Sequence, residues 1–154
     1  RHPERVRAIA LVGSTAPMPV SDAILDACAA NDPAAFNMLT EYGYSKRHLF
    51  GGNSNPGMWM VGSTLRLYER SRPHVLHNDM SACNTYSAGL ERAATVRCPV
   101  LMVLGKGDRL TPLRGTPPLQ QALPDPRVVV LEDAGHSLMT EAPNLLLDAL
   151  REFL

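Results

Sequence analysis

The sequence has no excess of charge of either sign, few aromatic residues and no long apolar run. Lys and Arg number 15 and Asp and Glu also number 15, so the formal net charge at pH 7 is zero. Because nucleic acids and anionic membranes attract proteins through a basic excess, we expect neither as a partner. The apolar runs are far too short to span a bilayer. With 45% hydrophobic residues, the composition is that of an ordinary globular protein.

Cysteine is also scarce. The three cysteines, Cys28, Cys83 and Cys98, form no paired or metal-binding motif, so no disulfide framework is predicted. We expect reduced thiols and therefore a cytoplasmic protein. None of the three thiols has the sequence context of a catalytic nucleophile.

The usual features of a protein start are missing as well. The chain begins with Arg1 rather than Met, carries no signal-peptide pattern and reaches its first apolar run within a few residues. Its 154 residues are enough for one domain with one core. We expect a fragment of a longer protein or a truncated gene product.

Short apolar runs predict β-strands, and the segments between them predict helices. The strands are expected at residues 6–12, 99–104 and 127–131. The helices are expected at residues 21–30, 73–90, 116–123 and 143–154. Because the first run is uninterrupted, its strand is expected to be buried on both faces. Strands alternating with helices favour an α/β fold with a parallel sheet of about three strands.

Residues 16–73 differ from the rest of the chain. They are rich in Met, Asn, Gly and Pro and carry no strong strand signal, so a helical insertion is predicted. Ser21 or Asp22 is expected to cap its first helix. Residues 51–57 string together turn-forming residues and predict a loop.

A carboxylate and an imidazole each follow the end of a predicted strand. Asp108 lies in the loop after the second strand, and His136 lies in the loop after the third. One strand–helix–strand step separates them, so both are expected at the carboxyl edge of the sheet, where open α/β sheets place active sites. Asp108 would fix the tautomer of His136 and leave its other ring nitrogen free to act as a general base. Gly135 would allow the tight turn that presents the imidazole.

Several short motifs follow one another in a characteristic order. They are His2-Pro3-Glu4-Arg5-Val6, Pro99-Val100-Leu101, Gly105-x-x-Asp108-x-x-x-Pro112, Gly135-His136 and Glu141-x-Pro143. Each motif alone has little specificity, but the set spans almost the whole chain. In this order and spacing, the chain resembles the C-terminal part of an α/β-hydrolase-fold enzyme.

The resemblance implies a partial α/β-hydrolase fold in three parts. Residues 1–15 would hold the first core strand, residues 16–73 a helical cap or lid, and residues 74–154 the C-terminal core. It also implies that Asp108 and His136 are the acid and base of a Ser–Asp–His triad, which needs no metal or organic cofactor.

The nucleophile expected from the resemblance is missing. In that family a serine sits on a Gly-x-Ser-x-Gly elbow, and no serine of this sequence has a glycine two places away on both sides. Ser14, Ser54 and Ser63 all fail this test. We therefore expect the nucleophile, and one oxyanion-hole loop, upstream of this chain.

Two alternatives for the acid are weaker. Some members of the superfamily carry it after an earlier strand, but here residues 13–16 contain no carboxylate. Asp133 precedes His136 by only three positions and is interpreted as a solvated turn residue.

Other residues have both functional and structural interpretations. Met58, Trp59 and Met60 are candidate substrate-binding residues of an apolar pocket, although packing of the cap on the sheet explains them equally well. In the acid loop, Lys106 and Arg109 are interpreted as solvated charges rather than contacts to an anionic substrate.

Three further polar residues are given structural roles. His74 and His77 stand three positions apart, but no third ligand follows, so no metal site is predicted. Glu141 is expected to stabilise the start of the last helix through the helix dipole.

The function predicted from the resemblance is that of a serine-type hydrolase acting on a carboxylic ester or related acyl bond of a small apolar substrate. An upstream Asp nucleophile would instead give a dehalogenase or epoxide hydrolase, and a carbon–carbon-bond hydrolase would keep the serine. A non-catalytic remnant or binding module of the same fold is the alternative from another class. The chain alone is expected to be inactive and to self-associate through the open edge of its first strand.

Overall fold

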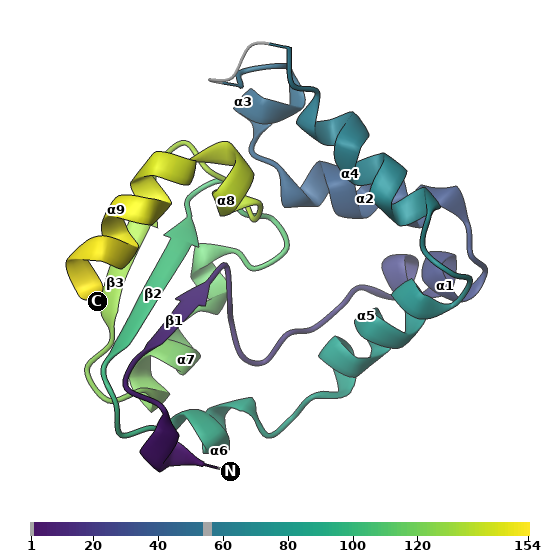
Figure 1. The fold of residues 1–154 in the computed structure, drawn as a ribbon. Helices are drawn as coiled ribbons and strands as arrows, with labels where there is room; N and C mark the ends of the chain where they lie inside the picture. The colour runs from purple at the N-terminus through teal and green to yellow at the C-terminus, as the bar shows by residue number, and fades with distance from the viewer. Residues whose placement is uncertain (1, 54–56) are drawn as a thin grey trace.

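The computed structural model describes residues 2–53 and 57–154 and contains a parallel sheet of three strands (Figure 1). In spatial order the strands are β1 (Ile9–Val12), β2 (Val100–Gly105) and β3 (Arg127–Leu131). Both neighbouring pairs are parallel, with Ile9 beside Val100 and Leu101 beside Arg127. The α/β fold class predicted from the sequence is therefore confirmed. Residues 54–56 of the predicted loop lie outside the described residues.

Helices surround the sheet and build a separate helical region. They are η1 (Pro3–Arg5), α1 (Asp22–Ala29), α2 (Pro33–Gly43), α3 (Lys46–Leu49), α4 (Met60–Glu69), α5 (Val75–Thr85), α6 (Gly89–Ala93), η2 (Leu113–Gly115), α7 (Pro117–Ala122), α8 (Leu138–Glu141) and α9 (Pro143–Phe153). None of the helices in the described part of the chain has the length and hydropathy needed to cross a membrane.

The central strand β2 carries the core, and all its residues are buried. Because side chains alternate along a strand, one set faces α6 and α7 and the other faces α8 and α9. Met102 and Leu104 pack with Leu119 on the first face. On the second face, Leu101 and Val103 contribute to a cluster that also contains residues of α8 and α9. Helices therefore cover both faces of the sheet, as in other parallel α/β proteins.

The first strand is shorter and more exposed than predicted. A 3-10 helix occupies Pro3–Arg5, and the strand begins only at Ile9. The expectation of burial on both faces is wrong, because Ala10 is exposed and the other residues of β1 are half-buried. The reason is topological: β1 is an edge strand of the described sheet, with β2 on one side only.

The predicted helix over residues 73–90 is two helices. α5 ends at Thr85, Tyr86 is extended, and α6 begins at Gly89, so the single helix expected here is wrong. A Cβ atom on Gly89 would lie 2.9 Å from the Cβ of Ala16. The glycine allows α6 to pack against the segment that follows β1.

Three helix starts agree with the sequence. Ser21 is the N-cap residue of α1, and Thr116 precedes Pro117 at the start of α7. Pro143 is the first residue of α9, as its fixed φ favours. The side chains at 146, 150 and 153 of this helix join the core on the second face of the sheet.

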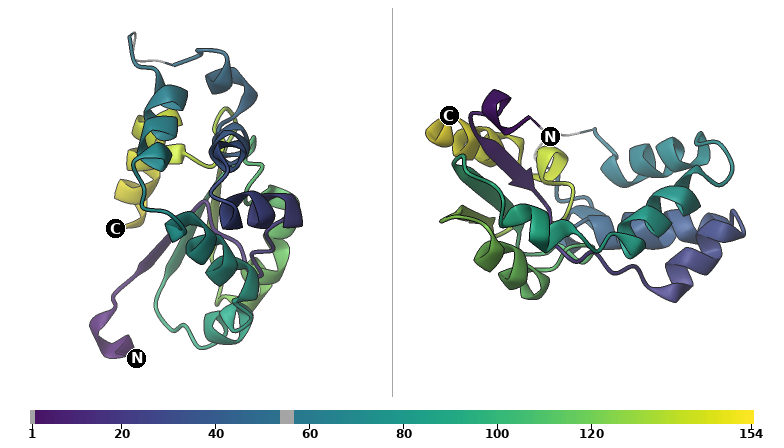
Figure 2. Two further views of the ribbon diagram at one scale, coloured as in Figure 1. Left: turned by 90° about the vertical axis from the view of Figure 1, so that its right-hand side faces the viewer. Right: turned by 90° about the horizontal axis from the view of Figure 1, so that it is seen from below.

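Helices α1 to α5 form a second body to one side of the sheet (Figure 1 and Figure 2). Its small core is built on buried Ile24, Cys28 and Leu39, with Leu76 and Met80 of α5 packed against them. We call residues 16–73 the cap region. α5, which follows the cap region in the chain, also packs on the core of this second body. The division of the chain at residue 73 stays a prediction.

Candidate active site

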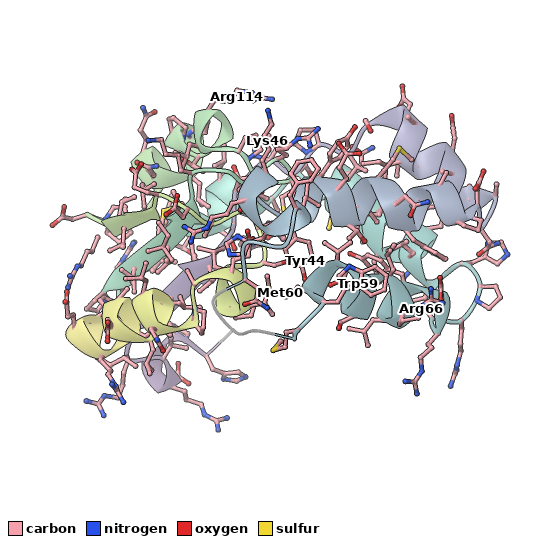
Figure 3. The ribbon with its side chains drawn as sticks, turned by 90° about the horizontal axis from the view of Figure 1, so that it is seen from above. Tyr44, Lys46, Trp59, Met60, Arg66 and Arg114 are labelled. Carbon is pink, nitrogen blue, oxygen red and sulfur yellow. The ribbon has the colours of Figure 1, made fainter. Side chains whose placement is uncertain are left out.

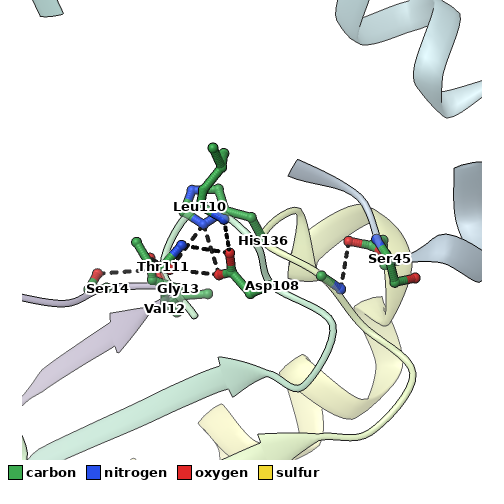
Figure 4. Close-up of polar contacts among 10 residues, drawn as sticks. Val12, Gly13, Ser14, Ser45, Asp108, Leu110, Thr111 and His136 are labelled. Atoms are coloured by element: carbon green, nitrogen blue, oxygen red, sulfur yellow. Dashed lines mark hydrogen bonds and ion pairs between the residues drawn. The ribbon is translucent and has the colours of Figure 1, made fainter. Parts of the chain in front are cut away.

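The structure brings the Asp108 and His136 side chains together at the carboxyl ends of β2 and β3 (Figure 4). His136 Nδ1 lies 3.0 Å from Asp108 Oδ2. The two loops also bond to each other, because Lys106 N donates to Leu131 O at 2.9 Å and Gly107 N donates to the next loop at 2.8 Å. Neighbouring parallel strands thus produce the juxtaposition that the spacing in the sequence predicts.

Asp108 is buried and fully supplied with donors. Its Oδ1 accepts hydrogen bonds from Leu110 N at 2.8 Å and Thr111 N at 2.7 Å, a turn that an Asp forms with its own backbone. Its Oδ2 faces His136 and the Thr111 hydroxyl, which is 2.6 Å away. Burial raises the pKa of the carboxyl, but the hydrogen bonds from His136 and Thr111 outweigh burial and hold the pKa below its ordinary value.

His136 is held by its backbone and by one ring nitrogen. His136 N and Ser137 N both donate to Gly43 O, at 3.0 and 3.1 Å, and Nδ1 faces Asp108. Because Nδ1–H donates to the carboxylate, the neutral ring carries its lone pair on Nε2. The side chain is 36% exposed, and within residues 2–53 and 57–154 Nε2 has no hydrogen-bond partner. This arrangement suits an imidazole that accepts a proton from a group outside the described residues.

Thr111 belongs to the site and was not identified from the sequence. Its hydroxyl lies 2.6 Å from Asp108 Oδ2 and 2.9 Å from Gly13 O at the end of β1. With a single proton, the hydroxyl donates to one of these acceptors at a time. The residue joins the acid loop to the first strand. A threonine three places after an aspartate in a turn is a signal for this contact.

Gly135 is needed for space rather than for an unusual backbone angle. Its φ lies outside the left-handed region, so the predicted turn does not depend on a positive φ. A Cβ atom at this position would lie 2.5 Å from Ser45 N and 2.9 Å from Glu141 Oε1. The cap region therefore approaches the His136 loop as closely as backbone atoms allow.

The prediction for Glu141 is wrong. The residue ends α8, before the start of α9, and its side chain is 0% exposed. Its Oε1 accepts a hydrogen bond from Gly135 N and its Oε2 accepts one from Ser45 N, both at 2.9 Å. His48 Nδ1 lies 2.9 Å from the same Oε2. Glu141 connects the His136 loop to the cap region, a role that no local pattern in the sequence indicates.

The candidate substrate-binding residues of the cap region, Met58, Trp59 and Met60, lie at the start of α4. Met58 is 54% exposed and Trp59 is 68% exposed. Met60 is buried, and its carbonyl accepts a hydrogen bond from the Tyr44 hydroxyl at 3.4 Å (Figure 3). None of the three lines either cavity described below. Their role in substrate binding stays a prediction.

The larger cavity, of about 510 Å³, is an open cleft beside the acid loop. Its lining is rich in cations: Lys46, Lys106, Arg109 and Arg114. Figure 3 labels two of them, Lys46 and Arg114. Lys106 pairs with Glu132 at the surface, and Arg109 pairs with Glu41 at 3.0 Å. These exposed pairs support the interpretation of Lys106 and Arg109 as solvated charges.

A smaller cavity of about 100 Å³ lies inside the helical body, next to Cys28 and Phe36. Burial raises the pKa of the Cys28 thiol, which disfavours the reactive thiolate. All three cysteines are free. The cavity therefore lacks an activated nucleophile among its lining residues.

The remaining candidates lie elsewhere. Asp133 is exposed and pairs with Arg47 at 3.0 Å, so His136 takes Asp108 as its carboxylate partner. His74 lies at the start of α5 with its ring 3.2 Å from the Asn31 side-chain amide. In the part of the chain that the structure describes, no three His, Cys, Asp or Glu side chains are grouped to hold a metal ion.

Comparison with known proteins places this geometry in context. The profile of the alpha/beta hydrolase family matches residues 3–149. A thermophilic esterase shares 25% identity with a TM-score of 0.83, over 100% of this chain and 58% of the esterase. An enzyme that degrades N-acyl homoserine lactones is similar at 20% identity and a TM-score of 0.82, over 99% and 60% of the two chains.

A bromoperoxidase from Bacillus anthracis shows the same fold at 16% identity and a TM-score of 0.81, over 97% of this chain and 58% of the bromoperoxidase. No curated protein matches the chain. This chain spans less than two thirds of the length of each of the three structures.

Proposed function

The chain belongs to the alpha/beta hydrolase family, and from this premise we propose that it supplies the acid and base of a serine hydrolase acting on small apolar carboxylic esters. The observation that carries the proposal is the 3.0 Å contact between His136 Nδ1 and Asp108 Oδ2, which leaves Nε2 without a partner in the described residues. The esterases among the similar structures support the substrate class.

In this mechanism His136 Nε2 accepts the proton of a serine hydroxyl as the serine oxygen attacks the ester carbonyl. Asp108 stabilises the resulting imidazolium and keeps the ring in the productive orientation. His136 then returns the proton to the alcohol that leaves. Water repeats the cycle on the acyl-enzyme, with His136 again as the base, and no metal or cofactor is required.

We further propose that the nucleophile comes from polypeptide outside these 154 residues. The chain spans only 58% of the similar thermophilic esterase, and none of its serines fits the nucleophile elbow. In the described sheet β1 has a strand on one side only, which suits the addition of a further strand. Free Cys28, Cys83 and Cys98 are in keeping with a cytoplasmic location.

The test is His136→Ala in the protein that also carries the nucleophile. Loss of the base is expected to lower kcat for an aryl ester by at least about 10⁴-fold. His77→Ala, on α5, is the matched control and should keep full activity. Turnover within tenfold of the original in His136→Ala would reject the proposal. The 154-residue chain alone should hydrolyse the ester at the background rate. A non-catalytic remnant would differ from the proposed enzyme by staying at the background rate after the upstream segment is restored.

A further inference from the structure

We propose that Glu141 is a positioning residue that fixes the His136 loop against the cap region. The inference rests on the proposed function of His136 as the general base. It deepens that function by naming the residue that holds the backbone of His136 in position.

The Glu141 carboxylate accepts hydrogen bonds from two backbone amides. Gly135 N, directly before His136, donates to Oε1, and Ser45 N in the cap region donates to Oε2, both at 2.9 Å. The two amides lie far apart in the sequence, so one side chain joins two segments that share no local structure. Each oxygen serves a different segment, and both oxygens are therefore needed.

The side chains around this contact are buried. The Glu141 side chain is 0% exposed and that of His48 is 5% exposed, so neither has water to replace a lost partner. His48 Nδ1 lies 2.9 Å from Glu141 Oε2 and 2.8 Å from Ser45 Oγ. A buried carboxylate persists only when its oxygens are supplied with donors, and here each oxygen accepts one backbone amide, from Gly135 or from Ser45. The His48 ring fills the space beside Oε2 and is hydrogen-bonded to Ser45 Oγ.

The backbone beside Glu141 also joins the two segments. Gly43 O accepts hydrogen bonds from both His136 N and Ser137 N. The chain at Gly43–Ser45 thus runs along the loop that carries the imidazole, and Glu141 closes the other side of this contact. Displacement of the cap region here would carry the His136 backbone with it.

An internal comparison separates this role from general stabilisation. The Arg47–Asp133 ion pair joins the same two segments at 3.0 Å, but its side chains are 60% and 73% exposed. Exposed ion pairs contribute little, whereas buried hydrogen bonds to a carboxylate contribute more. Asp133→Asn is therefore the matched control for Glu141→Gln.

The experiment measures the local geometry by NMR on the isotope-labelled protein that also carries the nucleophile. In Glu141→Gln only one acceptor oxygen remains, and the new NH₂ group faces an amide donor. We expect hydrogen exchange of the Gly135 and Ser45 amides to become about tenfold faster, with the β2 amides as an internal reference. We also expect the His136 Nδ1–H resonance, which reports the hydrogen bond to Asp108, to shift and broaden.

Asp133→Asn should change neither readout. Three results would overturn the inference: unchanged exchange and an unchanged His136 resonance in Glu141→Gln, an equal acceleration in β2 that indicates only global destabilisation, or the same effects in Asp133→Asn. None of these readouts requires turnover. If His136→Ala retains activity while Glu141→Gln shifts the His136 loop, the proposed function fails and the positioning role stands.

Discussion

Two carboxylate–histidine pairs lie on either side of the same loop, and they differ in how far the histidine reaches solvent. Asp108 faces His136 at 3.0 Å, and Glu141 faces His48 at 2.9 Å. The His136 side chain is 36% exposed, whereas that of His48 is 5% exposed. The same pair of groups therefore has two consequences. A half-exposed ring can exchange a proton with a bound molecule, and a buried ring can only hold its neighbours.

The two carboxylates also differ in where their amide donors come from. Asp108 takes its two amides from Leu110 and Thr111, so the acid loop organises itself. Glu141 takes its amides from Gly135 and from distant Ser45. A local turn presents a functional group, and a long-range contact fixes where that turn lies.

The largest expected effect tests the exposed pair. In Asp108→Asn the side-chain amide donates toward Nδ1, which reverses the tautomer of His136 and puts the proton on Nε2. We expect kcat of the nucleophile-bearing protein to fall by about 10⁴-fold. Ester hydrolysis at saturating substrate measures it, with Asp133→Asn as the control. A fall of less than tenfold would remove the distinction between the two pairs.

A second prediction concerns stability, to which the buried pair is expected to contribute more than the exposed pair. His48→Ala removes a buried ring that lies 2.9 Å from Glu141 Oε2 and is hydrogen-bonded to Ser45 Oγ, and it should lower the free energy of unfolding by about 2–3 kcal/mol. His136→Ala leaves Asp108 with the amides of its own turn and should cost about 1 kcal/mol or less. Urea unfolding of both variants of the nucleophile-bearing protein gives the two values. Equal losses would mean that burial of the ring does not set its structural importance.

Part of this architecture can be predicted from the sequence, because it depends on residues that are close together in the chain. The apolar run of β2, the cap of α1 and the starts of α7 and α9 depend on neighbours in the chain, and the structure has them where predicted. The meeting of Asp108 and His136 follows from the topology of adjacent parallel strands.

Other features depend on contacts across the fold. The exposure of β1 follows from its edge position, and the start of α6 at Gly89 follows from the approach of Ala16. The bond from Glu141 to Ser45 joins residues 96 positions apart. No pattern in either segment indicates the other, which is why the residue was assigned to a helix dipole.

A smaller effect is expected at Thr111, which joins the acid loop to β1. Thr111→Val keeps the shape and removes the hydroxyl that lies near Asp108 and Gly13. We expect a loss of about 1 kcal/mol in unfolding free energy. The Asp108 pKa should rise toward its ordinary value, because one of the hydrogen bonds that lower it is gone. Thermal unfolding and NMR titration of the carboxyl measure the two changes, and an unmoved pKa would contradict the assignment.

The smallest effect concerns the loss of stability at acidic pH. The folded-state pKa of Asp108 is lowered, so its contribution to stability is complete above the unfolded pKa of about 3.9 and is lost as pH falls through the folded value. Asp108→Asn should therefore show a shallower loss of stability below about pH 4 than the original chain. Urea midpoints between neutral and acidic pH compare the slopes. Identical slopes would show that other carboxyl groups dominate acid unfolding.

The Gly43 carbonyl, which receives two amides from the His136 loop, limits how this protein can be re-engineered. Anyone exchanging the helical region for that of another hydrolase must choose where to splice. Grafts that retain Gly43–Ser45 keep the backbone edge to which the His136 loop is hydrogen-bonded. Grafts that begin earlier must rebuild that edge from foreign sequence.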